Sequence, residues 1–211
     1  MTSTVMLAAM RTILDESSAS FWTDAEAYAA LADGQNEVIK ELLGVYRIKR
    51  RLDPDHPLPH ELESVLNDDT GTTQTVTVPS GFLELVAATF DHNGSGGEKP
   101  CVISNIGVLG FEENNTFLAA TAEDPSAYVK SVTDVMKIVF LPTLSGTPAF
   151  TIWYVKSPTD IASGQNALLP ATTHSAIVNY ATARMLEKDQ RQESQILYGK
   201  YLQELKTILG I

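Results

Sequence analysis

The sequence is poor in cysteine and has no long hydrophobic run. Cys101 is the only cysteine in 211 residues, so no internal disulfide can form, which is typical of proteins that fold in a reducing compartment. No stretch approaches the roughly 20 consecutive apolar residues of a membrane span. The short apolar run 5–10 follows no basic segment of the kind that begins a signal peptide. We expect a soluble chain that no signal peptide exports.

Cations are scarce as well. The chain has 15 Lys and Arg against 26 Asp and Glu, which gives a formal net charge of −11 and a pI near 4.7. Proteins that coat nucleic acid need clustered cations to neutralise phosphates, so this composition argues against that mode of binding. The hydrophobic content of 44% is enough for a substantial core, as one domain or as one domain that carries an insertion.

The sequence also lacks motifs for catalysis. No serine lies in a G-x-S-x-G elbow, and Cys101 lies in an apolar run where packing is the expected role. His174 follows two threonines near an expected helix start, but no acid partner or nucleophile accompanies it. We interpret it as a histidine that is hydrogen-bonded to its neighbours. The sequence therefore predicts no enzyme and no catalytic residue.

Candidate metal and cofactor motifs fail on spacing. Residues 91–97 imitate the first half of an EF-hand loop, but Val102 stands where the bidentate glutamate is required, and no helices flank the segment. His56, His60 and Glu61 are separated by prolines, which remove the helical spacing that gathers ligands. The glycine cluster does not lead into Lys-Ser or Lys-Thr at a helix start, so it makes no phosphate-binding loop. We expect no metal and no cofactor.

The best-defined element that the sequence does contain is a helix over residues 23–51. Thr23 and Glu26 have the spacing of a capping box. Its apolar face repeats at steps of three and four and contains Tyr28, Leu31, Ala32, Val38, Ile39, Leu42 and Tyr46. Gly34, beside Gln35 in this face, costs roughly 1 kcal/mol relative to alanine in a helix interior. Two interpretations stay open: another segment approaches the backbone closely at Gly34, or the helix tolerates a weak turn.

Three further helices are expected. The first spans 2–14 with a cap at its start, the third begins near 169 or 170 and ends near 189, and the fourth spans about 190–209. The last two should form an antiparallel hairpin that packs on the first pair. We expect the rings of Phe21 and Trp22 to pack and fix the entry angle of the second helix. The expected apolar face of the fourth helix contains Tyr198, Tyr201, Leu202, Leu205, Ile208 and Leu209.

Short strand-like runs begin at residue 72 and are separated by Gly, Asn and Pro. The runs are TQTVTVPSGFLELVAATFD, CVISNIGVLGF, NTFLAAT, VMKIVFLP and AFTIWYV. They predict an antiparallel β domain at 67–164, with a hairpin tip at 92–97. This domain is inserted between residues 1–66 and 165–211, which together form a four-helix bundle. The expected fold class is α+β.

The second helix ends in a cluster of cations. Arg47, Lys49, Arg50 and Arg51 lie within five positions. Cations offset the negative end of the helix dipole, so a solvated helix end is the ordinary interpretation. The alternative is a binding site for an acidic partner surface or a phosphate backbone, because the cluster exceeds what a cap needs.

Motifs along most of the chain resemble the adaptor, or head-to-tail connector, proteins of tailed bacteriophages. The likeness begins at ILDESSASFWTDAEAYAALADGQNEVIKELL, which has a short helix, an acidic turn and a second helix with Gly-Gln at mid-length. It continues in VTVPSGFLELVAATFD and FTIWYVKSPTDI, and it closes with the helix pair LPATTHSAIVNYATARMLEKDQRQESQILYGKYLQEL. Asp33 stands where the family frequently has asparagine. The segment 94–135 is longer than a minimal member needs, which leaves its partner unassigned.

This resemblance implies a structural virion protein of the neck, assembled in the host cytoplasm. It implies a ring of about twelve copies beneath the portal protein, which extends the DNA channel and gives tail proteins of the nozzle or tail-tube type a platform. The helical bundle would build the ring wall, and DNA would pass without sequence-specific binding. The expected charged interface positions, chosen for clustering and location, are Arg47, Arg50, Arg51, Lys200 and Lys206.

Two other functions stay open at this point. One is a different capsid or tail component, such as a tail completion protein, which docks elsewhere than the portal. The other is a small ligand-binding or enzymatic module in the β domain, in which Trp153 or Tyr154 stacks on a ligand. Strand alternation places one of these two rings in the core. No long apolar patch remains beyond the expected intramolecular faces, so we expect monomers until the portal templates a ring.

Overall fold

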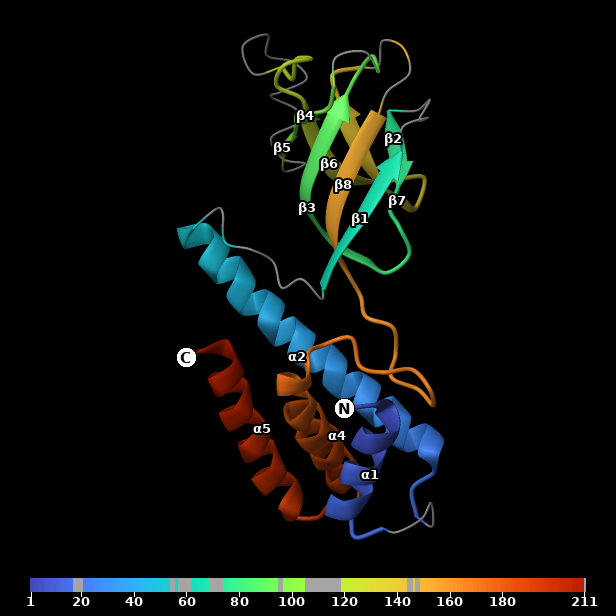
Figure 1. Ribbon diagram of the computed structural model, residues 1–211, viewed down its shortest axis with the longest axis vertical. Helices are drawn as coiled ribbons and strands as arrows, with labels where there is room; N and C mark the ends of the chain where they lie inside the picture. The colour runs from blue at the N-terminus through green and yellow to red at the C-terminus, as the bar shows by residue number, and fades with distance from the viewer. Residues whose placement is uncertain are drawn as a thin grey trace. The chain divides into compact units, whose positions relative to one another are not determined.

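The chain forms two compact units in a computed structural model (Figure 1). The helical unit comprises Met1–Leu62 and Pro158–Ile211, and the β unit comprises Glu63–Ser157. The α+β class expected from the sequence is confirmed. The structure describes residues 1–16, 21–53, 56, 62–68, 74–94, 97–104, 119–143, 146 and 149–210.

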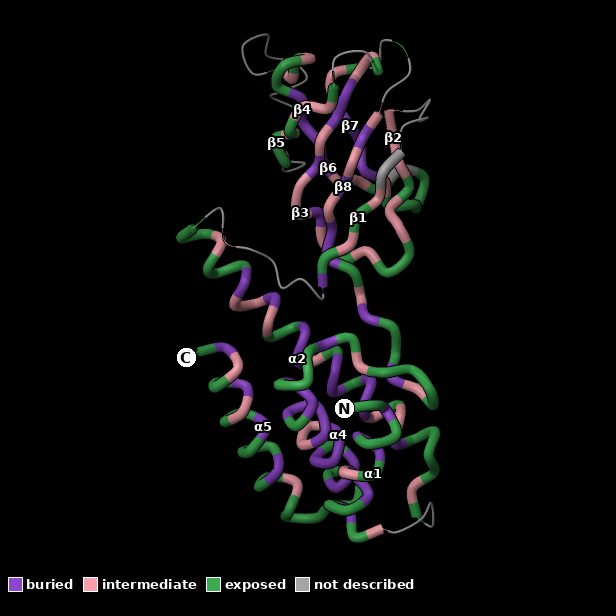
Figure 2. The backbone as a smooth tube through the Cα atoms, viewed as in Figure 1, coloured by how far each residue is buried: buried purple, intermediate pink, exposed green. Residues whose placement is uncertain are grey.

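The helical unit is built around α4. Its helices are α1 (Ser3–Ile13), α2 (Asp24–Leu52), α4 (His174–Lys188) and α5 (Glu193–Leu209), with the 3₁₀ turn η2 (Ala171–Thr173) before α4. α4 packs against α1, α2 and α5, and Figure 2 shows that most of it is buried. Segments from the two ends of the sequence therefore share one core.

Local sequence sets the first two helix starts, as expected. The Thr2 hydroxyl accepts a hydrogen bond from the Val5 amide and caps α1. At the start of α2, the Thr23 amide donates to the Glu26 carboxylate at 2.9 Å, and the Glu26 amide donates back to the Thr23 hydroxyl at 3.3 Å. This reciprocal pair is the predicted capping box, and it satisfies amides that the first turn leaves without partners.

The last two helices begin later than the sequence predicts. Pro170 is extended, with φ at −61° and ψ at 157°, and its carbonyl accepts from the Thr173 amide, so a 3₁₀ turn precedes α4. α5 begins at Glu193 instead of near Gln190, because Gln190 takes a positive φ of 56° and turns the chain. The expected end of the third helix is confirmed, since Asp189 is the C-cap of α4.

The β unit consists of two four-stranded sheets. Its strands are β1 (Glu63–Asp68), β2 (Thr75–Thr77), β3 (Phe82–Asp91), β4 (Lys99–Pro100), β5 (Val102–Ile103), β6 (Ser126–Val132), β7 (Val135–Leu141) and β8 (Ala149–Lys156). One sheet has the order β1-β8-β3-β4 and the other β2-β7-β6-β5. The β5–β6 pair is parallel and the other described pairs are antiparallel. The expectation of a purely antiparallel domain is therefore wrong at β5.

Three strands, β1, β4 and β6, are missing from the sequence prediction. β1 has a polar sequence and becomes a strand by pairing along β8. β6 joins β7 through Thr133 and Asp134, which both have positive φ, a geometry for which Asn-Gly is the usual signal. Of the expected strand 115–121, residues 119–121 form no strand and the remainder lies outside the described residues.

Side chains from both sheets meet in one apolar core. Phe90 of β3 stacks on Phe140 of β7 with ring centroids 4.9 Å apart, and Phe140 stacks on Phe150 of β8 at 5.3 Å. Tyr154 belongs to the same core while its neighbour Trp153 is half-buried, so the predicted alternation of these two rings is confirmed. This packing leaves Tyr154 unable to stack on a ligand.

Candidate functional site

The crossing of α2 and α4 depends on Gly34. A Cβ atom at this position would lie 2.8 Å from the Ile177 carbonyl oxygen and 3.3 Å from the Ile177 Cγ2 atom. Real Cβ atoms do not approach backbone oxygen so closely, so only glycine lets α4 pack at this distance. Of the two interpretations that the sequence left open, the close approach is correct.

Gln35 anchors the segment that leads from the β unit back to α4. Its side chain is fully buried, its Nε2 donates to the Thr159 carbonyl at 3.1 Å, and its Oε1 accepts from the Leu168 amide at 2.9 Å. Asn166 in the same segment accepts from the Ser3 amide at 3.0 Å. Residues 158–170 are therefore held against α2 and α1 by directional polar contacts.

Arg11 ties α1 to the start of α2, a role that the sequence analysis missed. The residue is 9% exposed, and its guanidinium contacts Glu16 at 3.1 Å, the Trp22 carbonyl at 3.1 Å and Asp24 at 2.5 Å. A buried cation needs such partners to offset its loss of hydration. No local spacing marks it, because the three partners come from the connection and the next helix.

The pair Phe21 and Trp22 differs from the expectation. Phe21 is 64% exposed, so the prediction that its ring packs into the helical unit is wrong, whereas Trp22 is half-buried. Their rings meet edge to face at 5.2 Å. The Glu16 carboxylate accepts from the Phe21 amide, and Arg11 donates to the Trp22 carbonyl. These polar contacts, rather than the aromatic rings, fix the direction in which the chain enters α2.

The predicted interface cations of α2 lie on its last turns. Arg47 and Arg51 are exposed, as is Lys49. Arg50 is half-buried, its Nη1 donates to the Tyr46 hydroxyl at 3.0 Å, and its guanidinium lies 5.9 Å from the centre of the Tyr46 ring. Arg50 therefore also stabilises the position of the Tyr46 side chain.

The other two predicted positions, Lys200 and Lys206, are exposed on α5. They lie on a different helix from the arginines. The sequence thus located exposed cations on two helices of the helical unit.

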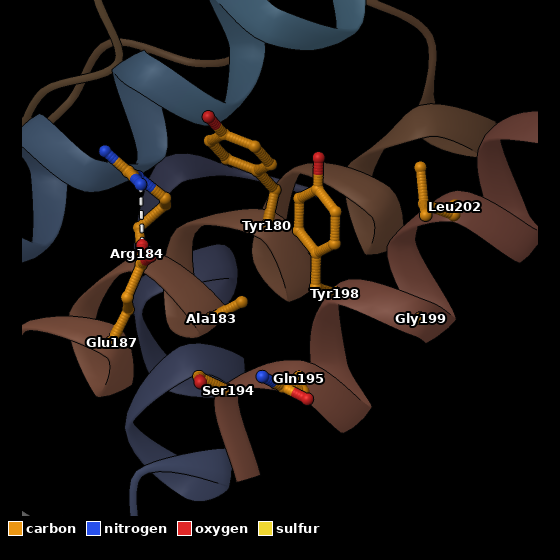
Figure 3. A pocket seen from close by; sticks show the side chains of 9 residues that line it. All are labelled: Tyr180, Ala183, Arg184, Glu187, Ser194, Gln195, Tyr198, Gly199 and Leu202. Carbon is orange, nitrogen blue, oxygen red and sulfur yellow. Dashed lines mark hydrogen bonds and ion pairs between the residues drawn. The ribbon is translucent and has the colours of Figure 1, made fainter. Parts of the chain in front are cut away.

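A groove of about 580 Å³ lies between the second half of α4 and the first half of α5 (Figure 3). Arg184 and Glu187 form an ion pair at 2.6 Å on its α4 side. Tyr198 and Leu202 remain 45% and 42% exposed, so their assignment to a buried face of the fourth helix is wrong. The residues that line the groove are Tyr180, Ala183, Arg184, Glu187, Ser194, Gln195, Tyr198, Gly199 and Leu202.

One feature of the sequence indicates this groove: the apolar positions of α5 cover more of the helix surface than the part that is buried. Tyr201, Leu205 and Leu209 of the stripe are buried as expected, and Leu197, which lies outside the predicted stripe, is buried with them. The remaining apolar positions of α5 had to face elsewhere. Tyr198 and Leu202 are the ones that line the groove.

Three tyrosines gather where α4, α5 and α2 meet. The ring of Tyr201 contacts Tyr180 edge to face at 5.1 Å and Tyr198 at 5.6 Å. Burial raises the pKa of Tyr201, and the carboxylates of Glu37 and Glu41 raise it further. Burial followed by Glu37 also raises the pKa of Tyr180. The phenols of Tyr180 and Tyr201 therefore stay neutral, and they lie beside acidic side chains of α2.

The two side chains considered for catalysis are in structural environments. His174 is buried, its Nε2 lies 2.8 Å from the Leu169 carbonyl, and its Nδ1 lies 2.6 Å from the Met1 amino group. Its expected hydrogen bonding to neighbours is confirmed, and burial lowers its pKa. Cys101 packs against the β core, and burial followed by Glu98 raises the pKa of its thiol to about 12. A thiol with that pKa is a poor nucleophile at neutral pH.

The loop that imitates an EF-hand uses its first carboxylate internally. Asp91 Oδ1 accepts from the amides of Asn93 and Gly94, and Oδ2 accepts from the Gly97 amide at 3.0 Å. Elsewhere, His56 lies 6.4 Å from the Tyr46 ring, while His60 and Glu61 fall outside the described residues. Within the described part of the chain, no three His, Cys, Asp or Glu side chains are grouped to hold a metal ion.

The family of the chain follows from a match over its entire length. Among the described residues, the helical unit has a groove between α4 and α5 and exposed cations at the end of α2. Both are surfaces that another protein can contact. The family model for the SU10 adaptor protein matches residues 1–211. The chain belongs to the SU10 adaptor protein family, a family of phage head–tail adaptors.

The family gives the coarse identity that the sequence predicted, a structural phage adaptor of the virion neck with portal and tail proteins as partners. A comparison with curated proteins gave no match. Among the described helices, none combines the length and the apolar character needed to cross a bilayer.

Proposed function

We propose that the chain is an adaptor subunit that assembles as a ring of about twelve copies beneath the portal protein. The ring extends the DNA channel and offers tail proteins a docking platform. The observation that carries this proposal is the family match over all 211 residues. In this role the chain is a structural protein and performs no catalysis.

In this proposal the four helices act as one bundle and form the ring wall, while the β unit contacts other neck proteins. The support for a rigid wall is the α2–α4 crossing at Gly34, together with the Gln35 hydrogen bonds that fix residues 158–170. Elements that must hold neighbours in a closed ring need a fixed shape, because ring closure depends on a constant angle between copies.

The proposed channel conducts DNA without binding it. The support is the net charge of −11, because an acidic surface repels phosphates and leaves the duplex mobile. We expect the isolated chain to show no retention on immobilised duplex DNA at physiological salt. Tight, salt-sensitive binding would contradict this part of the proposal.

Arg47, Arg50, Arg51, Lys200 and Lys206 are the proposed charged interface positions. Their support is exposure, which four of the five share. The double reversal Arg47→Glu with Arg51→Glu tests the α2 group, and Lys200→Glu with Lys206→Glu tests the α5 group. We expect each to reduce incorporation into portal complexes at least tenfold, whereas the control Lys156→Glu, an exposed cation of the β unit, leaves incorporation unchanged.

The decisive experiment measures the size of the isolated chain and then of a mixture with portal protein. We expect monomers alone and a ring-sized complex with the portal, since the portal templates assembly. Rings without portal would contradict the templating but not the adaptor role. A chain that never co-purifies with the portal would overturn the adaptor role in favour of another component, such as a tail completion protein.

A further inference from the structure

For two glycines of the helical unit, no close packing contact within the described residues explains why the position is glycine. At Gly44 in α2 and Gly199 in α5, no atom of the described residues lies within 4 Å of the position that a Cβ would take. Glycine in a helix interior costs roughly 1 kcal/mol relative to alanine, and at Gly34 the close approach of α4 explains that cost. At Gly44 and Gly199 a neighbour outside the chain would explain it, since glycine is what allows another backbone or side chain to come close.

Gly44 begins an exposed apolar stripe on the end of α2. Ile48 and Leu52 follow at steps of four and are 60% and 85% exposed. Residues at such spacing lie on one side of a helix. An exposed stripe of glycine, isoleucine and leucine at a helix end is a surface that association with another protein would bury.

Charge is divided along α2. Residues 24–43 contain five acidic side chains and one lysine, whereas residues 44–52 contain four cations and no acid. Asp33, Glu37 and Glu41 lie at steps of four on the acidic part. Of these, Glu37 and Glu41 act on the neighbouring Tyr201. The helix thus carries a basic apolar tip and, further back, an acidic strip beside the tyrosines.

The groove between α4 and α5 has the complementary character. Tyr180, Tyr198 and Leu202 give it an apolar surface, and Gly199 leaves room in its wall (Figure 3). Its own cation, Arg184, is neutralised by Glu187 at 2.6 Å. With the acidic strip of α2 next to the tyrosines, the groove suits a ligand that is apolar and basic.

We propose that the tip of α2 in one copy, residues 44–52, inserts Ile48 and Leu52 into the α4–α5 groove of a second copy, with Arg47 and Arg51 facing the acidic strip. This inference rests on the proposed ring and names the contact between its subunits. Donor and acceptor surfaces differ, so the interface is heterologous and can repeat head to tail until a ring closes.

The tip cannot occupy the groove of its own chain. Tyr180 lies against Gly34, with its Cδ1 atom 3.5 Å from the position of a Cβ there. At 1.5 Å per residue, Leu52 lies about 27 Å further along the same helix. The end of the tip therefore lies about 27 Å along α2 from the point where Tyr180 of the groove meets this helix, and a second copy is needed to bring the tip and a groove together.

Cysteine crosslinking tests the contact on the full chain, in the presence and absence of portal protein. With portal protein present, the variant Ile48→Cys with Leu202→Cys should form a ladder of covalent dimers, trimers and larger species under mild oxidation, because each copy carries both halves of the contact. Without portal protein the ladder should be weak, because the isolated chain is expected to be monomeric. Each single variant should give less than a tenth of that product. The natural Cys101 contributes little background, since its pKa is about 12 and it is half-buried.

The matched control is Val5→Cys with Leu202→Cys, which pairs the groove with an apolar position on α1 that is 50% exposed. A ladder from this control as strong as that of the test variant would mean random collision and would overturn the proposal. So would dimers from Ile48→Cys alone, which indicate a symmetric contact of two tips. A Leu202→Cys thiol that crosslinks to portal protein instead of to a second copy would assign the groove to the portal and also overturn the proposal.

A second variant separates association from folding. Gly199→Leu fills the groove, and the open space around Gly199 predicts that the monomer keeps its full stability. We expect it to reduce the ladder at least tenfold. A full ladder in this variant contradicts the proposed site. Loss of the ladder with portal binding retained leaves the adaptor role standing, whereas a ladder in a chain that never binds portal would overturn that role and keep this contact.

Discussion

The helical unit and the β unit hold their parts in register by different means. Among the described residues, the buried polar side chains of the helical unit are Ser3, Arg11, Gln35, Thr173, His174 and Thr182. In the β unit they are Asp91 and Ser126, and the centre of the core is a stack of three phenylalanines. Directional contacts are thus concentrated where helices meet.

The physical reason lies in the backbone. A helix satisfies its own amides and carbonyls, so nothing in its backbone fixes how far it slides along a neighbour, and side chains such as Gln35 must do so. A strand shares its backbone hydrogen bonds with its neighbour, and the ladder itself sets the register. The β unit can therefore fill its core with apolar rings without losing a unique arrangement.

The largest effect is expected at the apolar centre of the β unit. Phe140→Ala removes the ring that stacks on both Phe90 and Phe150, and truncation of a buried phenylalanine costs about 3–5 kcal/mol. Denaturant unfolding gives the free energy, and hydrogen exchange should show the loss in the β unit. The control Phe21→Ala, at an exposed ring, should change stability by less than about 0.5 kcal/mol. Equal losses of unfolding free energy in the two variants would contradict the importance of the phenylalanine stack for the β unit.

The polar side of the comparison is tested at Gln35. Gln35→Leu keeps much of the volume but leaves the Thr159 carbonyl and the Leu168 amide without this partner. Both hydrogen bonds are part-buried, and the loss of two such bonds costs about 1–3 kcal/mol together. Hydrogen exchange should show the loss in the helical unit, first at residues 158–170. The control is Asn36→Ala on the exposed face of α2, and the prediction fails if both variants unfold alike.

A pair of glycine variants sharpens the role of helix contact. Gly34→Ala forces a methyl group against the Ile177 carbonyl, and such overpacking costs about 1–3 kcal/mol. Gly199→Ala meets no described atom within 4 Å and should raise the unfolding free energy by up to about 1 kcal/mol through helix propensity. Thermal and denaturant unfolding measure both changes. Changes of the same sign would contradict the assignment of Gly34 to the crossing.

The smallest effect is a pH dependence of the helical unit. Burial lowers the pKa of His174, with the Met1 amino group adding to it and the Leu169 carbonyl opposing it. The folded pKa lies below the ordinary value of 6.5, so the unfolded chain binds the proton first as pH falls. Stability from neutral His174 is complete above pH 6.5 and declines as pH falls from that value toward the folded pKa.

The measurement compares the wild-type chain with His174→Gln, whose amide can still donate to Leu169 but does not titrate. Unfolding free energies at pH 7.5 and pH 5 should differ more in the wild type than in the variant. An identical pH dependence in both would show that His174 is not the group responsible. Carboxylates contribute equally to both proteins, so the difference isolates the imidazole.

Sequence reasoning succeeded where a structure depends on neighbours in the chain. The capping box of Thr23 and Glu26 needs only four consecutive residues, and it forms as predicted. The alternation that buries Tyr154 follows from the geometry of a single strand. The exposed cations of α2 and α5 could likewise be found from the pattern of charge.

It failed where the deciding partner is distant. β1 has a polar sequence and becomes a strand only by pairing with β8, which lies about ninety residues later in the chain. Glu63, for example, pairs with Val155. Tyr198 and Leu202 belong to an apolar stripe, and nothing local shows that α4 covers only part of it. The hydrogen bonds of Arg11 also depend on how the connection folds back.

The sequence by itself determined the class of the fold, the caps of the first two helices and the acidic balance, because each of these depends on composition or on short-range spacing, and its motifs resemble those of the phage adaptor family. Only the tertiary structure decided why residue 34 is glycine, what Gln35 holds and which apolar side chains of α5 remain uncovered. Those outcomes depend on atoms brought together from distant parts of the chain, and periodicity records which face of a helix is apolar but not what packs against it.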